Sequence, residues 1–227
     1  MSTLTKMALG VMGQLRARPA RGSSTKTIAL PAPDRSGGLP LMKALAKRRS
    51  LREFSSRPLP MPVLSGLLWA AFGVNRRGGG RTAPSAIDAQ EIDVYVALPS
   101  GAYLFDAKEH RLRLVAAKDL RRITGYQDFV DEAPLDLVYV ADHSRMKLVP
   151  VDFRESFASV AAGAITQNVY LYAASTGLAT VIRAWIDRAR STTRSLWTLR
   201  KRAASSTRRM RRSPRSTFGP SSEANAS

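Results

Sequence analysis

The chain has 227 residues, of which 44% are hydrophobic, enough for one good-sized folded domain or two small ones. It has no cysteine and two histidines, which excludes a disulfide framework, a thiolate metal site and a cysteine nucleophile and argues against a multi-histidine metal site. Of the formal charge of +19, residues 188–227 supply +10, because they hold 11 Lys and Arg against one acidic residue, Glu223. Nucleic-acid binding would therefore be a property of this tail and not of the whole protein.

The N-terminus carries a short apolar run, Met7–Gly13, between Lys6 and Arg16. This run is at the lower limit for a signal-peptide core, and no convincing cleavage site follows it. No apolar run in the sequence reaches the length of a membrane span. We therefore expect a cytoplasmic protein that does not bind membranes, with export as the alternative.

The first half of the chain shows helical and loop signals. Residues 1–38 are rich in Gly, Pro, Ser and basic residues and are expected to form a loosely ordered arm, with one short extended candidate at Thr27–Leu30. The spacing of apolar residues predicts a helix over Pro40–Arg49. A second helix is predicted to begin at the Pro60 and Pro62 pair and to end at Gly73.

Strand patterns follow, at Ile92–Leu98, Tyr103–Phe105, Arg111–Val115 and Leu135–Ala141. A long helix is then predicted from Asp152, which forms a capping box with Glu155, to Ser175, with Gly177 as its stop. This helix is apolar on nearly all sides, which is typical of a core centre or a dimer interface. A further strand is predicted over Leu178–Trp185. Helices mixed with meandering strands, without a regular βαβ alternation, indicate an α+β fold.

Residues 188–227 consist mainly of Arg, Ser and Thr and have no apolar period. Such a segment has too few apolar residues to offset its ordering entropy, so a disordered basic tail is expected. One hypothesis is that the tail is read in a shifted frame, because GC-rich DNA read out of register gives this composition. The other is a genuine basic tail.

Three segments carry residue types suited to ligand binding. Arg48–Phe54 has the pattern R-x-S-x-R-x-F, whose guanidinium groups and hydroxyl match phosphate oxygens, although a solvated basic helix end is the ordinary alternative. Arg81–Glu91 offers small and polar side chains before a strand, where a ligand can approach the backbone, and an ordinary loop is its alternative. Ala164–Val181 places Gln167 and Asn168 in an apolar helix, where both amides need partners if buried.

Taken together, in this order and spacing, the three segments resemble the FMN-dependent nitroreductase family over about residues 39–187. The resemblance is greatest to the branch that includes nitroreductase-like dehydrogenases and thiazole-forming dehydrogenases. It implies a sandwich of a mainly antiparallel sheet with helices, dimerised through a long central helix, with FMN at the interface and both subunits contributing. The domains would be an arm (1–38), an FMN-binding domain (39–187) and the tail (188–227).

The resemblance also implies which residues bind the cofactor. The phosphate and ribityl chain would contact Arg48, Arg49, Ser50 and Arg52. The loop beside the ribityl chain and ring would contribute Pro84, Ser85, Ala86, Asp88 and Gln90, and the segment that passes the ring would contribute Ile182, Arg183 and Ala184. Asp88 stands where the family often has Asn or Gly, and its charge would lower the flavin potential.

The implied activity is electron transfer from NADH or NADPH to an electron-poor small molecule such as a nitro compound or a quinone. FMN would carry the chemistry, so neither a catalytic side chain nor a metal is expected. The family continues past residue 187 with a helix and a strand that embrace the partner, and residues 188–227 show no such pattern. The alternatives are therefore an inactive, truncated family member and a basic-tail protein that binds nucleic acid non-specifically.

Overall fold

The computed structural model describes residues 2, 4–5, 18–19 and 26–183 of the chain. The expectations for the basic tail, for the run Met7–Gly13 and for Ala184 fall outside these residues. Within them, none of the helices is both long and apolar enough to cross a membrane.

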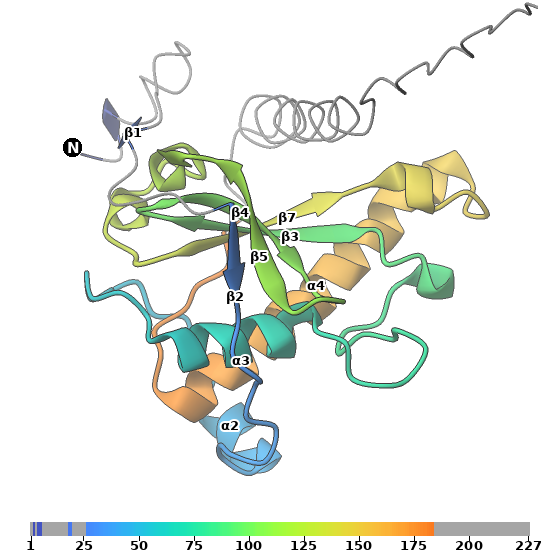
Figure 1. Ribbon diagram of the computed structural model, residues 1–227, viewed down its shortest axis with the longest axis horizontal. Coiled ribbons are helices and arrows are strands. Elements are labelled where there is room, and N and C mark those ends of the chain that lie inside the picture. Colours follow the sequence, from blue (N-terminus) through green and yellow to red (C-terminus); the bar gives the residue numbers. More distant parts are fainter. Residues whose placement is uncertain (1, 3, 6–17, 20–25, 184–227) are drawn as a thin grey trace, which may run out of the picture.

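A five-stranded sheet forms the centre of the described structure (Figure 1). Its strand order is β2-β5-β4-β3-β7, and every pairing is antiparallel. The strands are β2 (Thr27–Ala29), β3 (Ile92–Leu98), β4 (Gly101–Asp106), β5 (Arg111–Ala116) and β7 (Asp136–Ala141). A separate pair joins β1 (Arg18–Pro19) to β6 (Lys118–Asp119). The four predicted strands between residues 92 and 141 are thus present, and the extended candidate near residue 27 is the edge strand β2.

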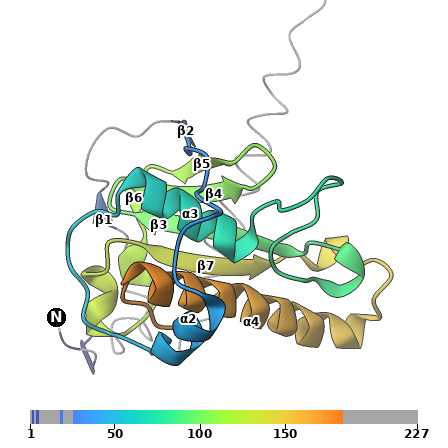
Figure 2. The same ribbon diagram turned by 90° about the horizontal axis from the view of Figure 1, so that it is seen from below.

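Helices cover one face of this sheet, as both views show (Figures 1 and 2). They are α2 (Leu41–Lys47), α3 (Met61–Phe72) and α4 (Val151–Thr176). Strand alternation directs Ile92, Val94 and Val96 of β3 towards the helices, where they share one core with apolar residues of α3 and α4. Tyr95 of the same strand faces the other way and packs with Ala102 and Leu120. The predicted α+β architecture is confirmed.

The start of α4 differs from the predicted capping box. Pro150 is the N-cap residue, and no side chain accepts a hydrogen bond there. Asp152 lies inside the first turn, where its negative charge still interacts favourably with the positive end of the helix dipole. The predicted end is confirmed, because Gly177 adopts a left-handed conformation with φ 74° and donates its N–H to Ala173 O.

The described part of the segment predicted as a strand at Leu178–Trp185 is not a strand. Its backbone pairs instead with a loop and a side chain. Thr180 O accepts the N–H of Leu51 at 2.9 Å, and the N–H of Ile182 donates to the Tyr170 hydroxyl at 2.8 Å. No neighbouring strand within the described residues supplies a ladder, so the strand prediction is wrong for the described part of this segment.

Candidate functional site

The Arg48–Arg52 segment begins where α2 ends. Arg48 is the C-cap residue of α2 and donates its N–H to Ala44 O at 2.9 Å. Arg49, Ser50 and Arg52 are exposed. Within the part of the chain that the structure describes, the guanidinium groups of Arg49 and Arg52 have neither an ion pair nor a hydrogen bond. Both are therefore available to an anionic ligand.

Tyr170 of α4 joins this segment to the end of the described chain. Its hydroxyl lies 2.9 Å from Ser50 Oγ and accepts the N–H of Ile182 at 2.8 Å. The guanidinium carbon of Arg48 stands 5.2 Å from the centroid of the Tyr170 ring. The structure thus brings the first and third sequence motifs together through a tyrosine that the sequence analysis did not select. The sequence feature that could have identified Tyr170 is its place in an apolar helix, because the hydroxyl of a buried tyrosine needs a hydrogen-bond partner.

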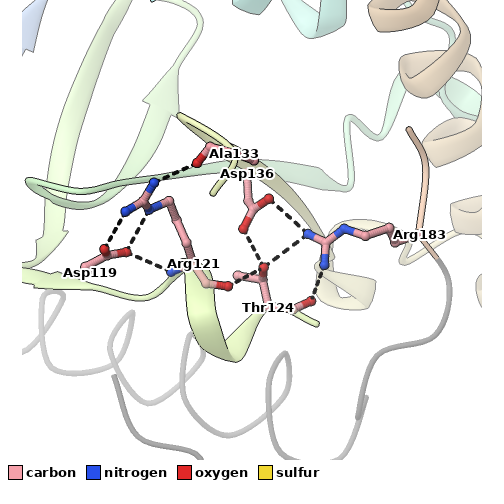
Figure 3. Close-up of polar contacts among 6 residues, drawn as sticks. All are labelled: Asp119, Arg121, Thr124, Ala133, Asp136 and Arg183. Atoms are coloured by element: carbon pink, nitrogen blue, oxygen red, sulfur yellow. Dashed lines mark hydrogen bonds and ion pairs between the residues drawn. The ribbon is translucent and has the colours of Figure 1, made fainter. Parts of the chain in front are cut away.

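The Arg183 side chain points towards Asp136 and Thr124 (Figure 3). Its Nη2 donates to Asp136 Oδ1 at 3.0 Å and to Thr124 Oγ1 at 3.1 Å, and its Nη1 donates to Thr124 O at 3.3 Å. Ile182, one position earlier, has 56% of its side chain exposed. Among the residues expected beside the flavin ring, Ile182 is thus open to a ligand, whereas the guanidinium of Arg183 is already paired.

Asp136 lies in a buried polar network (Figure 3). Burial raises its pKa from 3.8 to about 6, although Arg183, Thr124 and Arg121 oppose this shift by favouring the carboxylate. Arg121 also forms a buried ion pair with Asp119 at 2.7 Å and donates to Ala133 O at 2.6 Å. The network fixes the end of the described chain against the sheet.

The loop that carries Pro84, Ser85 and Ala86 has an unusual backbone. Ile87, Asp88 and Gln90 all have positive φ values, of 49°, 53° and 48°. Non-glycine residues in this region cost free energy, and such strain is concentrated at binding and active sites. Side chains hold the loop in shape: Ser85 Oγ accepts the N–H of Gln90 at 3.0 Å, and Gln90 Nε2 donates to Asp88 Oδ1 at 3.2 Å.

A cavity of about 320 Å³ adjoins this loop. Arg81 lines it, with its guanidinium carbon 5.3 Å from the centroid of the Phe72 ring and Nε donating to Gln90 Oε1 at 2.9 Å. Burial lowers the pKa of Arg81. Asn168 of α4 donates a hydrogen bond to Thr82 O, at the start of this loop, at 3.2 Å. Gln167 is exposed.

The two groups of candidate residues lie at opposite ends of α3. The Arg48–Arg52 segment precedes α3 and the loop with Ser85 follows it, and both ribbon views show them apart (Figures 1 and 2). A helix of 12 residues spans about 18 Å. One copy of the chain therefore does not bring the loop to the arginine segment.

Comparison with known proteins identifies the family. The model of the Nitroreductase family matches residues 45–205, so the match extends past residue 187, where the resemblance seen in the sequence motifs ends. A putative nitroreductase from Methanocaldococcus jannaschii is 33% identical over 151 residues, which cover 62% of this chain and 76% of that relative. A putative nitroreductase from Ralstonia eutropha, known from a crystal structure, is 55% identical to this chain. The match covers 82% of this chain and 86% of that protein's chain, with a TM-score of 0.75. The chain therefore belongs to the nitroreductase family.

Proposed function

We propose that the chain is an FMN-dependent oxidoreductase that transfers electrons from NADH or NADPH to an electron-poor small molecule such as a nitro compound or a quinone. The observation that carries this proposal is the arginine segment, where two exposed guanidinium groups that have no partner among the described residues lie on either side of exposed Ser50. A further support is the FMN reductase [NAD(P)H] of Bacillus subtilis, which is 26% identical over 153 residues, although the matched part covers 52% of that protein.

The residues at the phosphate end fit the cofactor. Arg49 and Arg52 can each donate to phosphate oxygens, and Ser50 adds a neutral donor between them. Arg48 is held over the ring of Tyr170, which fixes the start of the segment. These four residues would bind the phosphate and the ribityl chain.

The residues at the ring end would orient the isoalloxazine. The strained loop would contribute Pro84, Ser85, Ala86, Asp88 and Gln90, and the segment after α4 would contribute Ile182, Arg183 and Ala184. When bound, FMN supplies the electron transfer, while the chain binds and orients it. Because Asp136 already pairs with Arg183, the charge of Asp88 would meet little opposition from that arginine and would favour the oxidised cofactor.

A homodimer would complete the site. One copy keeps the loop and the arginine segment apart, and a second copy can supply the loop to the first. Exposed apolar side chains suited to such a contact lie on two helices, on α4 (Phe153, Phe157, Val160) and on α2 (Leu41, Met42, Leu45). Clustered exposed apolar residues are typical of protein interfaces.

Titration of FMN into the purified protein tests the proposal. We expect the wild type to bind FMN, with the absorbance of an oxidised flavin. Arg52→Ala should weaken binding about tenfold to a hundredfold, because one charged contact contributes roughly 1.5–3 kcal/mol. Arg113→Ala is the matched control, since Arg113 is an exposed arginine of β5 that pairs with Asp106. A wild type that binds no FMN would refute the proposed function, and equal affinities would refute the phosphate assignment alone.

Anaerobic addition of NADH or NADPH separates an active enzyme from an inactive family member. Loss of the flavin absorbance is expected with at least one donor. Bound FMN that neither donor reduces would favour the inactive member. Binding of nucleic acid that declines with salt, in a protein without flavin, would favour the basic-tail alternative.

A further inference from the structure

Tyr170 is buried in the last turns of α4, and its hydroxyl meets two segments that are far apart in the sequence. Ser50 Oγ lies 2.9 Å away across 120 positions, and the backbone N of Ile182 lies 2.8 Å away. Tyr170 as a whole residue is 5% exposed, so its hydroxyl is supplied with partners mainly by the protein.

The direction of each hydrogen bond follows from the available protons. A backbone N–H can only donate, so Ile182 uses a lone pair of the Tyr170 oxygen. The tyrosine proton is then free for an acceptor, and Ser50 Oγ is the acceptor within reach. If Ser50 donated instead, the tyrosine proton would have no acceptor among the contacts of the described residues. Ser50 therefore accepts from Tyr170, and its own proton points elsewhere.

We propose that Tyr170 is a positioning residue for the cofactor phosphate: by donating to Ser50, it makes the exposed Ser50 hydroxyl a donor for a phosphate oxygen held between Arg49 and Arg52. The same hydroxyl holds the backbone of Ile182, so one side chain fixes the relative position of the phosphate-binding segment and the segment that passes the ring. This inference rests on the proposed function, because it requires that FMN binds at Ser50.

Tyr172 provides a matched control on the same helix. Its hydroxyl donates to Val63 O at 3.2 Å, a backbone group of α3 that is not part of the arginine segment. Tyr170→Phe and Tyr172→Phe remove the same atom from the same helix, and each breaks contacts to another element. A purely structural effect of losing a tyrosine hydroxyl should therefore be seen in both variants.

The test compares FMN with riboflavin, which has the same ring system but no phosphate. We expect Tyr170→Phe to weaken FMN binding about threefold to tenfold, as for the loss of a neutral hydrogen bond. Riboflavin affinity should fall less than FMN affinity, because riboflavin loses the support of the Ile182 segment but has no phosphate contact to lose. Tyr172→Phe should change neither affinity. In a Ser50→Ala background, Tyr170→Phe should cost less FMN affinity than it does in the wild type, because the contact from Tyr170 to Ser50 is already lost.

A ligand-free measurement accompanies this comparison. Amide hydrogen exchange at Ile182 should become faster in Tyr170→Phe and stay unchanged in Tyr172→Phe, because the Tyr170 hydroxyl accepts that N–H. Should Tyr170→Phe fail to fold, Ser50→Ala still decides, since it should weaken FMN binding more than riboflavin binding.

The outcomes separate the inference from the function on which it rests. Equal losses for FMN and riboflavin, or an unchanged FMN affinity in Tyr170→Phe, would overturn the positioning role while the flavin site stands. A wild-type protein that binds neither ligand would overturn the proposed function and this inference with it.

Discussion

The guanidinium group of Arg183 lies against the carboxylate of Asp136, 47 positions earlier in the chain, with Nη2 3.0 Å from Oδ1. Thr124 contacts both partners, donating to Asp136 Oδ2 at 2.7 Å and accepting from Arg183 at 3.1 Å. Gly125 leaves the space for this arrangement, since a Cβ atom there would overlap the Arg183 guanidinium. A buried ion pair thus holds the segment that follows α4 to β7, through Arg183, which is one of the residues proposed to pass the flavin ring.

The first prediction concerns the pH dependence of stability. Folding raises the pKa of Asp136 from 3.8 to about 6, so between these pH values the folded state holds a proton that the unfolded state has lost. The contribution of this carboxyl group to stability is therefore full below pH 4 and is lost as the pH rises through about 6. Asn does not titrate, so the free energy of unfolding of Asp136→Asn, measured relative to wild type, should rise by on the order of 3 kcal/mol from pH 4 to pH 7. Urea unfolding at both pH values measures this difference.

Asp34 provides a control of opposite sign. The N–H and hydroxyl groups of Ser36 lower the pKa of this exposed carboxyl group. Asp34→Asn should therefore lose stability relative to wild type as the pH rises, by a small amount because water screens the site. If the stability difference between Asp136→Asn and wild type did not change with pH, the raised pKa of Asp136 would be wrong.

The sequence predicts the regular elements of this fold better than its polar contacts. The strands near residues 92–141 follow from alternation and turn residues, and the end of α4 follows from Gly177, because these signals are local. The start of α4 was misjudged because Pro150 takes the cap position ahead of Asp152. The strand predicted at Leu178–Trp185 failed because the Tyr170 side chain and the Leu51 backbone replace a ladder.

The contacts within the candidate site could not be predicted, for a different reason. The hydrogen bond from Tyr170 to Ser50 spans 120 positions, and the one from Arg183 to Asp136 spans 47. No local pattern encodes a pair at such separation, since each residue alone fits many surroundings. The motifs could identify the arginine segment and the Ser85 loop as candidates, but not that α3 keeps them apart within one copy.

The second prediction concerns the dimer. Phe153 and Phe157 stack on the surface of α4 with ring centroids 6.3 Å apart and remain 56% and 42% exposed. We expect the wild type to sediment as a dimer at micromolar concentration and Phe157→Asp to sediment as a folded monomer, because burying an unpaired carboxylate in an apolar contact costs several kcal/mol. FMN affinity should fall in the same variant, since the loop from the second copy is lost.

Met61→Asp is the control for this experiment. Met61 is 41% exposed and opens α3, where an acidic residue is compatible with the helix dipole. This variant should remain a dimer. A wild type that sediments as a well-folded monomer and still binds FMN would contradict the proposed role of the second copy.

The last prediction concerns the strain in the Ser85 loop. Ile87 has φ 49° and ψ 28°, a conformation that a β-branched side chain adopts at a cost, and its side chain is 62% exposed, so little packing is lost when it is removed. Ile87→Gly should stabilise the protein by about 1 kcal/mol, because relief of strain exceeds the entropy that glycine adds to the unfolded chain. Ile182→Gly is the control, because Ile182 is 56% exposed and is not among the residues with positive φ. The free energy of unfolding of this variant should fall by roughly 0.5–1 kcal/mol. FMN should bind Ile87→Gly no more tightly than wild type, since a loop already held in its binding shape gains nothing from added freedom. Urea unfolding and FMN titration measure both effects, and equal destabilisation of the two glycine variants would show that the backbone at Ile87 is not strained.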